Sequence, residues 1–289
     1  MSKIIVLGAT GMIGEKITRE LISAGHDVSI GARNTSAAQS KFQTETIKKA
    51  DVFDPLSILS AIEGQEIVCI CLSPDRNASK NAPMAEREGI QYILEASKRF
   101  GVKRIILLSS LVQRYQGMNN FDWWIFRLKI EAVKKVKESG IPYSIFYPSC
   151  VMETIARDII RGNRILLIGK SEAKMWFVSS TDMGKQIVRA LAIAGSSNQE
   201  YTVQGLKAYD WEEIAVLIRE HYKPGLSIVR IPIGVLKFGG YFSKMANYGA
   251  HICEALNKYP EKFESEKTFN DLGKPTILVE EFLSNLRIG

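Results

Sequence analysis

The first half of the chain alternates short apolar runs with longer amphipathic segments. The apolar runs cover residues 4–7, 28–32, 47–50, 67–72, 104–109 and 143–147, and helical patterns cover residues 13–24, 56–62, 83–100 and 126–139. Runs that are apolar at every position suit strands that are buried on both faces of a parallel sheet. Strands in strict alternation with helices favour a layered arrangement. The sequence therefore predicts an α/β fold with a doubly wound parallel sheet.

The pattern changes after residue 150. We expect short strands at 165–168, 175–178, 201–203 and 228–232 and helices at 181–194 and 211–221, followed by an apolar, glycine-dotted segment at 235–256. Residues 1–150 are expected to form the main domain. Residues 151–289 are expected to complete its layer and to form a small discontinuous lobe over the carboxyl edge of the sheet, where ligands bind in open α/β sheets.

Composition excludes several classes of protein. Of the 289 residues, 46% are hydrophobic and 24% are charged, with a formal net charge of +7, as is typical of a globular protein. No run of about 18 uncharged apolar residues occurs, so we expect no transmembrane segment. The apolar run at 4–7 is too short for the core of a secretion signal, so the cytoplasm is the expected location. Lysine and arginine are scattered without a nucleic-acid-binding motif, so we expect no nucleic-acid partner.

Cysteines and histidines show no metal-binding spacing. Cys69 and Cys71 are two residues apart, the other two cysteines stand alone, and the three histidines are far apart in the sequence. Zinc sites normally use pairs of ligands at short, characteristic spacings. We therefore predict no metal site, and we expect all four cysteines to be buried as small apolar side chains.

The most specific motif lies between the first predicted strand and the first predicted helix. It reads Gly8, Ala9, Thr10, Gly11, Met12, Ile13 and Gly14. Gly8 permits a sharp turn, Gly11 leaves room for a pyrophosphate, and Gly14 lets the helix pack close to the sheet. Amide groups at the start of the helix then face the phosphates. This context predicts that residues 1–150 are an NAD(P)-binding Rossmann domain, in which Gly8, Thr10, Gly11, Met12, Ile13 and Gly14 bind the cofactor.

The end of the second predicted strand bears on the choice of cofactor. Enzymes that select NAD usually place Asp or Glu there to bind the ribose diol. This chain has Arg33 instead. A guanidinium can form paired hydrogen bonds with a 2′-phosphate and can stack on adenine. The sequence therefore favours NADP over NAD.

With these motifs, the chain resembles the atypical short-chain dehydrogenase/reductase superfamily, and within it the NmrA-like and isoflavone-reductase-like NAD(P)H-binding proteins. The resemblance rests on the GxxGxxG spacing, on Arg33 and on residues 50–54, 108–110, 140–144 and 178–183. It covers about the first two thirds of the chain. The last third is similar only to the ending of sugar-nucleotide-epimerase-like relatives, at residues 267–273.

The resemblance implies further cofactor contacts. Asp51 and Val52 are expected to contact adenine, and Leu72 and Ser73 to line the ribose and pyrophosphate. The remaining expected contacts, at the ends of the next strands and on the helix between them, are Ser109, Lys129, Tyr147 and Pro148.

The resemblance also places an active-site lysine at Lys129 and serines at Ser109 and Ser110. Short-chain dehydrogenases usually carry a Tyr four residues before this Lys, on the same helix face, where the cation promotes proton transfer by the phenol. Here that position is Ile125, which cannot transfer a proton. Ordinary dehydrogenase or epimerase chemistry is therefore not expected in its usual form.

Three interpretations remain open. In the first, the protein is a reductase in which Lys129 acts as acid/base or orients a water, as in isoflavone-reductase-like enzymes. In the second, a displaced phenol, Tyr115 or Tyr147, reaches the nicotinamide. In the third, the fold binds NADP(H) without chemistry, as a redox sensor, regulator or assembly protein of the NmrA-like type.

We take the NADP-dependent reductase of a small carbonyl, quinone or enone as the leading hypothesis, with Lys129, Ser110 and Tyr147 as candidate catalytic residues. The non-catalytic protein is the alternative, and a nucleotide-sugar epimerase or dehydratase is third because it also needs the missing Tyr. Aromatic residues around the expected lobe favour an apolar or aromatic small-molecule substrate. A monomer or homodimer is expected, and the segment 235–256 could cover a second subunit or a membrane surface.

Overall fold

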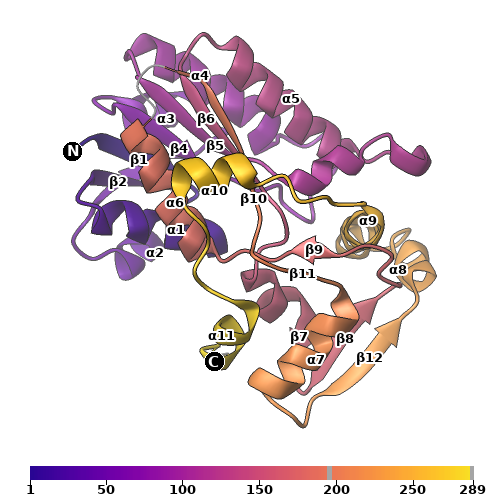
Figure 1. Ribbon diagram of the computed structural model, residues 1–289. Coiled ribbons are helices and arrows are strands. Elements are labelled where there is room, and N and C mark those ends of the chain that lie inside the picture. Colours follow the sequence, from indigo (N-terminus) through magenta and orange to yellow (C-terminus); the bar gives the residue numbers. More distant parts are fainter. Residues whose placement is uncertain (194–196, 287–289) are drawn as a thin grey trace.

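A seven-stranded parallel sheet forms the centre of the molecule (Figure 1). The computed structural model describes residues 1–193 and 197–286. The strands follow the order β10-β6-β5-β4-β1-β2-β3, and each neighbouring pair is parallel. Their bounds are β1 Lys3–Leu7, β2 Asp27–Ala32, β3 Thr46–Lys49, β4 Ile67–Ile70, β5 Arg104–Leu108, β6 Tyr143–Pro148 and β10 Gln199–Val203. The predicted doubly wound parallel sheet is confirmed.

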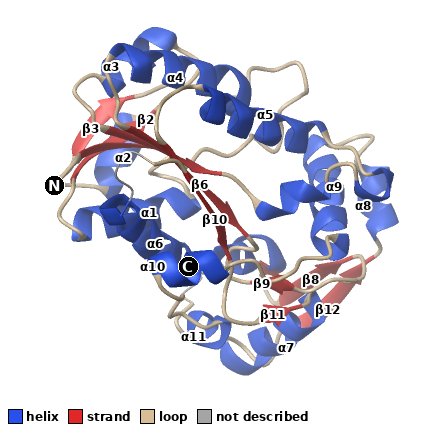
Figure 2. Cartoon of the chain, turned by 45° about the horizontal axis from the view of Figure 1, so that its top comes forward, coloured by secondary structure: helices blue, strands red, loops and turns tan. Residues whose placement is uncertain are grey.

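Helices cover both faces of this sheet (Figure 2). On one face lie α3 (Pro55–Ile62), α4 (Ile90–Arg99) and α5 (Trp124–Glu138). On the other lie α1 (Met12–Ser23), α2 (Thr35–Lys41), α6 (Ser180–Ile193) and α10 (Glu266–Leu272). Burial on both faces explains why the strand runs are apolar at successive positions, as in β4, where all four residues are buried.

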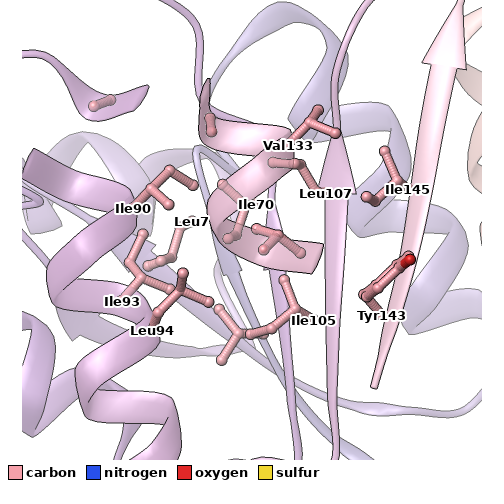
Figure 3. Close-up of a cluster of buried hydrophobic side chains, with 14 of the residues drawn as sticks. Leu7, Ile70, Ile90, Ile93, Leu94, Ile105, Leu107, Val133, Tyr143 and Ile145 are labelled. Carbon is pink, nitrogen blue, oxygen red and sulfur yellow. The ribbon is translucent and has the colours of Figure 1, made fainter. Parts of the chain in front are cut away.

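The core under α4 and α5 shows how the helices are held. Figure 3 shows side chains of the strands (Leu7, Ile70, Ile105, Leu107, Tyr143 and Ile145) and of the helices (Ile90, Ile93, Leu94 and Val133). The α4 side chains recur at spacings of three and four, which places them on one face of the helix. Full burial of each such aliphatic side chain contributes about 1.5–3 kcal/mol. This packing fixes the position of α5, which carries Lys129.

The second half of the chain adds a smaller lobe, drawn below the sheet in Figure 1. Its three-stranded sheet has the order β12 (Ser227–Ile231), β8 (Arg164–Ile168), β7 (Ile160–Arg161), and a separate pair joins β11 (Ala208–Tyr209) to β9 (Met175–Trp176). Besides α6 and α10, which cover the main sheet, the second half contributes the helices α7 (Trp211–His221), α8 (Ile233–Gly239), α9 (Lys244–Lys258) and α11 (Val279–Ser284). Short 3₁₀- or π-helical turns lie in both halves of the chain: η1 (Ala85–Gly89), η2 (Leu111–Tyr115) and η3 (Met118–Asn120) in the first, and η4 (Ile155–Ile159) in the second.

Several element boundaries differ from the prediction. The helix predicted at 83–100 is divided into the π-helical turn η1 and the α-helix α4. The helix predicted at 181–194 runs over Ser180–Ile193, and residue 194 lies outside the described residues. The strand predicted at 175–178 is only Met175–Trp176, with an isolated bridge between Val151 and Val178. Among the described residues, no helix has the length and apolar composition that crossing a bilayer requires.

Candidate functional site

The glycine turn after β1 has a backbone that only glycine fits. Gly8 has φ +89°, and a Cβ atom there would lie 2.5 Å from the carbonyl oxygen of Cys71. A Cβ atom at Gly14 would lie 2.2 Å from the carbonyl oxygen of Gly8. Both positions are therefore closed to a side chain by neighbouring backbone. The turn itself is held by a hydrogen bond from the Gly11 amide to the Gly8 carbonyl, 3.0 Å long.

This turn delivers the start of α1 to the carboxyl edge of the sheet. Gly11 is the N-cap residue, and no side chain caps the helix. The first-turn amides of a helix have no intrahelical acceptors, and the helix dipole favours an anion beside them. Strand order reverses between β1 and β4, which is the switch point where such sheets bind ligands. The residues present therefore fit the diphosphate of a dinucleotide.

The residues predicted to meet the adenosine half lie along the same edge, after β2 and β3. Arg33 is exposed, and its guanidinium makes no hydrogen bond or ion pair with the described residues. Lys49 donates a 2.6 Å hydrogen bond to the Arg33 carbonyl, so a second cation lies close by. Asp51 accepts from the amide of Phe53 at 3.1 Å, and Val52 is buried. The edge thus presents two cations where a 2′-phosphate is expected to bind.

A cavity of about 420 Å³ opens between the sheet and the smaller lobe. This volume lies within the usual range for small-molecule sites. It brings together seven of the residues singled out from the sequence: Ile13, Leu72, Ser73, Ser109, Ser110, Lys129 and Pro148. Because Ile13 belongs to the first turn of α1, the cavity reaches the start of the helix that is predicted to bind the diphosphate. Its other walls are largely apolar, with Ile125, Phe126, Leu166, Trp211, Ile252 and Leu256 among them.

Lys129 is paired with a residue that sequence reasoning missed. Its Nζ lies 3.7 Å from Oε1 of Glu86, and the side chains are 15% and 8% exposed. Neither carboxylate oxygen of Glu86 has a hydrogen-bond partner among the described residues. Both side chains line a small hollow that shares Leu72, Leu108 and Ser109 with the large cavity. Nothing in the sequence singles out Glu86, since a Glu near the start of a helix is common.

The two serines after β5 differ in their partners. The Ser109 hydroxyl donates to Oε1 of Gln113 at 3.1 Å. Ser110 precedes η2 without capping it, and its hydroxyl makes no hydrogen bond with the described residues. Ser110 is therefore the hydroxyl that is available to a ligand in the cavity.

The structure does not bring the two displaced phenols to the cavity. Tyr147 donates a 2.7 Å hydrogen bond to Glu200 on β10, and burial raises its pKa above the usual value. Tyr115 is fully buried beside Phe121. Neither lines the cavity, so we leave both out of the proposed site. The phenol that does line it, among the described residues, is Tyr248 of α9.

Four charged side chains on another part of the wall were also missed. Arg76, Arg157, Asp158 and Arg161 all line the cavity. Arg76 forms a bidentate pair with Asp158, at 2.8 and 3.0 Å, and lies over the ring of Tyr248 at 5.4 Å. Arg76 is 82 residues from Asp158 in the sequence, and α9 is distant from both, so no spacing pattern connects the three parts of this wall.

The cysteines offer no nucleophile. Cys69, Cys71 and Cys150 are buried, as expected, whereas Cys253 is half-buried. Cys150 and Cys253 line the cavity, but burial raises the pKa of each thiol to about 12. Thiolates are the reactive form, so these side chains serve as apolar wall. In the described part of the chain, no three metal-ligating side chains gather at one point.

Comparison with known proteins identifies the family. A family model described as "NAD(P)H-binding" matches residues 8–193. The photosystem II assembly factor Ycf39 of Guillardia theta is 24% identical over 259 residues, which is 88% of this chain and 81% of that protein.

Solved structures share the fold over nearly the whole chain. The NADPH-dependent quinone oxidoreductase of Escherichia coli, complexed with NADPH, has a TM-score of 0.72 at 21% identity and covers 97% of this chain and 98% of its own. The triphenylmethane reductase of Citrobacter sp., complexed with NADP(H), has a TM-score of 0.76 at 18% identity with the same coverage. Together with the glycine turn and the uncapped start of α1, the family match is decisive: the chain belongs to the NAD(P)H-binding family.

Proposed function

We propose that the protein is an NADP(H)-dependent reductase of a small carbonyl, quinone or enone. The observation that carries the proposal is the meeting of Lys129 and Ser110 in a cavity that extends from the start of α1. Two structural neighbours support the reaction class, since one is described as an NADPH-dependent quinone oxidoreductase and the other as a triphenylmethane reductase.

The glycine turn and the carboxyl edge would hold the cofactor. The amides at the start of α1 bind the diphosphate, Leu72 and Ser73 lie along the adjoining ribose, and Arg33 with Lys49 binds the 2′-phosphate. Arg33 makes NADP the preferred form, because a guanidinium matches a phosphate and leaves the diol of NAD without an acceptor. When bound, the cofactor supplies the hydride for the reduction.

The chain's own groups then act on the acceptor oxygen. Ser110 donates a hydrogen bond to that oxygen, and Lys129 donates a proton to it as negative charge develops. Glu86, which lines the adjoining hollow and not the large cavity, holds the Lys129 ammonium in place. The apolar walls exclude water, which strengthens both interactions.

The proposal is tested by mixing the protein with NADPH and a panel of quinones, aldehydes and enones and following the loss of NADPH absorbance. Lys129→Met should lower kcat by roughly 100-fold while NADPH binding, measured by calorimetry, changes little. Lys134→Met is the matched control, because Lys134 lies on the same helix and is 72% exposed. Tight NADPH binding without turnover of any acceptor would refute the reductase.

A non-catalytic role is the second candidate. The observation that favours it is Ile125, which lines the cavity where short-chain dehydrogenases carry the proton-donating Tyr. A relative described as a photosystem II assembly factor points the same way. In that case the NADP(H)-loaded protein would bind a partner, and Lys129→Met would leave its function intact.

A further inference from the structure

One part of the cavity wall carries more positive charge than its packing requires. Arg76 follows β4, Arg157 and Asp158 belong to η4, and Arg161 belongs to β7. Arg157 donates to Oδ2 of Asp158 at 3.0 and 2.7 Å, and Arg161 lies 3.9 Å from Oδ1. Three guanidinium groups therefore share one carboxylate, which leaves a net charge of about +2 at this wall.

One of the three arginines is enough to pair with the Asp158 carboxylate. Arg76 joins the loop after β4 to the smaller lobe through its bidentate pair with Asp158, and this satisfies both carboxylate oxygens. Burial pushes the pKa of Asp158 upward, but hydrogen bonds from Arg76 and Arg157 outweigh it and hold the pKa below its usual value. Asp158 is thus an anion throughout the neutral range. Its single negative charge balances only one of the three arginines, so the positive charges of Arg157 and Arg161 exceed the negative charge at this wall.

No other anion on the cavity wall balances this excess. Among the described lining residues of the large cavity, Asp158 is the only carboxylate, and Lys129 is already paired with Glu86 in the adjoining hollow. Cations of one sign that line a cleft with apolar walls attract an anion more strongly than cations on an open surface. The side chains of Arg157 and Arg161 are 45% and 56% exposed, so they remain accessible to a ligand from solvent.

We propose that the substrate is an amphipathic anion, with an apolar body against the walls of the cavity and one carboxylate or other oxyanion bound by Arg157 and Arg161. Planar guanidinium groups bind such oxyanions through paired, charge-assisted hydrogen bonds. The inference rests on the proposed function, because it specifies the substrate class of the same cavity. It narrows the proposed substrates, a small carbonyl, quinone or enone, to those that also carry an acidic group.

A matched pair of fluorescent probes tests this without turnover. 1-Anilinonaphthalene-8-sulfonate and N-phenyl-1-naphthylamine share an apolar body, and only the first carries an anionic group. Each is titrated into the protein saturated with NADP⁺, so that the cofactor's own phosphates already occupy their site. The sulfonate should bind at least about tenfold more tightly than the neutral probe.

The double variant Arg157→Gln/Arg161→Gln removes the two excess charges and keeps the Arg76–Asp158 pair. It should bind the two probes with nearly equal affinity, and its affinity for the neutral probe should stay unchanged, which shows that the cavity is intact. The control is Arg219→Gln/Lys223→Gln, which makes the same charge change at exposed positions of the same lobe outside the cavity lining. It should keep the wild-type preference.

Three results would overturn the inference. They are equal binding of both probes by the wild type, an equal loss of preference in the control variant, and weaker NADP⁺ binding in the arginine variant, which would assign the cluster to the cofactor. Each of these results leaves the proposed reductase untouched. Failure of that proposal appears instead as absent NADPH binding or absent turnover.

Discussion

Nζ of Lys129 lies 3.7 Å from Oε1 of Glu86, in a pair that is shielded from solvent beside the cavity. Glu86 belongs to the π-helical turn Ala85–Gly89, and Lys129 to the facing helix α5. Single π-turns are frequent at functional sites, where they displace a side chain from its α-helical position. The Glu86 carboxylate has no hydrogen-bond partner among the described residues. The nearby Lys129 ammonium is therefore the main group that offsets the cost of burying this carboxylate.

The first prediction concerns this pair. Glu86→Gln should lower kcat by roughly tenfold with little change in KM, because Lys129 loses the group that positions it. In a Lys129→Met background the same change should have no further effect on kcat, since residues that act as a unit are non-additive. Steady-state kinetics on the four proteins measures this. Glu95→Gln, on the exposed side of α4, is the control, and additive effects of Glu86→Gln and Lys129→Met would contradict the pairing.

The second prediction concerns cofactor choice. Arg33→Asp should weaken NADPH binding by roughly 10- to 100-fold, because a carboxylate repels the 2′-phosphate. NADH binding should improve or stay the same, since a carboxylate accepts from the ribose diol. Calorimetric titration of both cofactors checks this, with Arg99→Asp as a control at the distant end of α4. Equal losses of affinity for NADPH and NADH would show that Arg33 does not bind the adenine ribose or its 2′-phosphate.

The sheet and the phosphate turn were predictable because their signals are local. Strands buried on both faces must be apolar at successive positions, and the turn needs glycine at Gly8 and Gly14 because backbone fills the space beside them. Lys129 came from family resemblance and lies in the cavity. The separation of η1 from α4 was not predictable, because π- and α-helical turns share the same amphipathic pattern.

The charged wall was not predictable for a different reason. Arg76 and Asp158 are 82 residues apart in the sequence and meet only after the smaller lobe has folded against the sheet. The partner of Tyr147 was not predictable either, because period-two alternation along a strand does not say which group accepts the hydrogen bond of its hydroxyl. The acceptor is Glu200, on a strand 53 residues later in the chain.

The third prediction separates Tyr147 from the chemistry. Tyr147→Phe should leave kcat within about twofold of the wild type, because the hydroxyl serves Glu200, which also pairs with Lys137 at 2.7 Å. The lost hydrogen bond should cost about 1 kcal/mol in the free energy of unfolding. Urea denaturation and steady-state kinetics measure the two effects. A loss of kcat comparable to that of Lys129→Met would restore Tyr147 as a proton donor.

The fourth prediction compares two glycines in helices. Gly14→Ala places a methyl group 2.2 Å from the Gly8 carbonyl oxygen, so the turn must shift. We expect the free energy of unfolding to fall by roughly 1–3 kcal/mol and NADPH to bind more weakly. Gly234→Ala is the matched control in α8, because nothing lies within 4 Å of its added Cβ. It should stabilise the protein by about 0.5–1 kcal/mol. Unchanged NADPH binding in a folded Gly14→Ala variant would contradict the role given to the turn.

The last prediction concerns pH and the segment after α9. Burial raises the pKa of Glu261 from its usual 4.5 to about 7, although hydrogen bonds from Gln204 and Ser149 oppose the shift. The native state therefore holds this proton more tightly than the unfolded chain, so stability is present at low pH and is lost as pH rises from 4.5 to about 7. Glu261→Gln should stabilise the protein by about 2–3 kcal/mol at high pH and by less than about 1 kcal/mol near pH 5. Urea unfolding at the two pH values measures this. Glu212→Gln, at an exposed carboxylate paired with Arg230, is the control, and a pH-independent effect of Glu261→Gln would show that the buried carboxyl is ionised at both pH values.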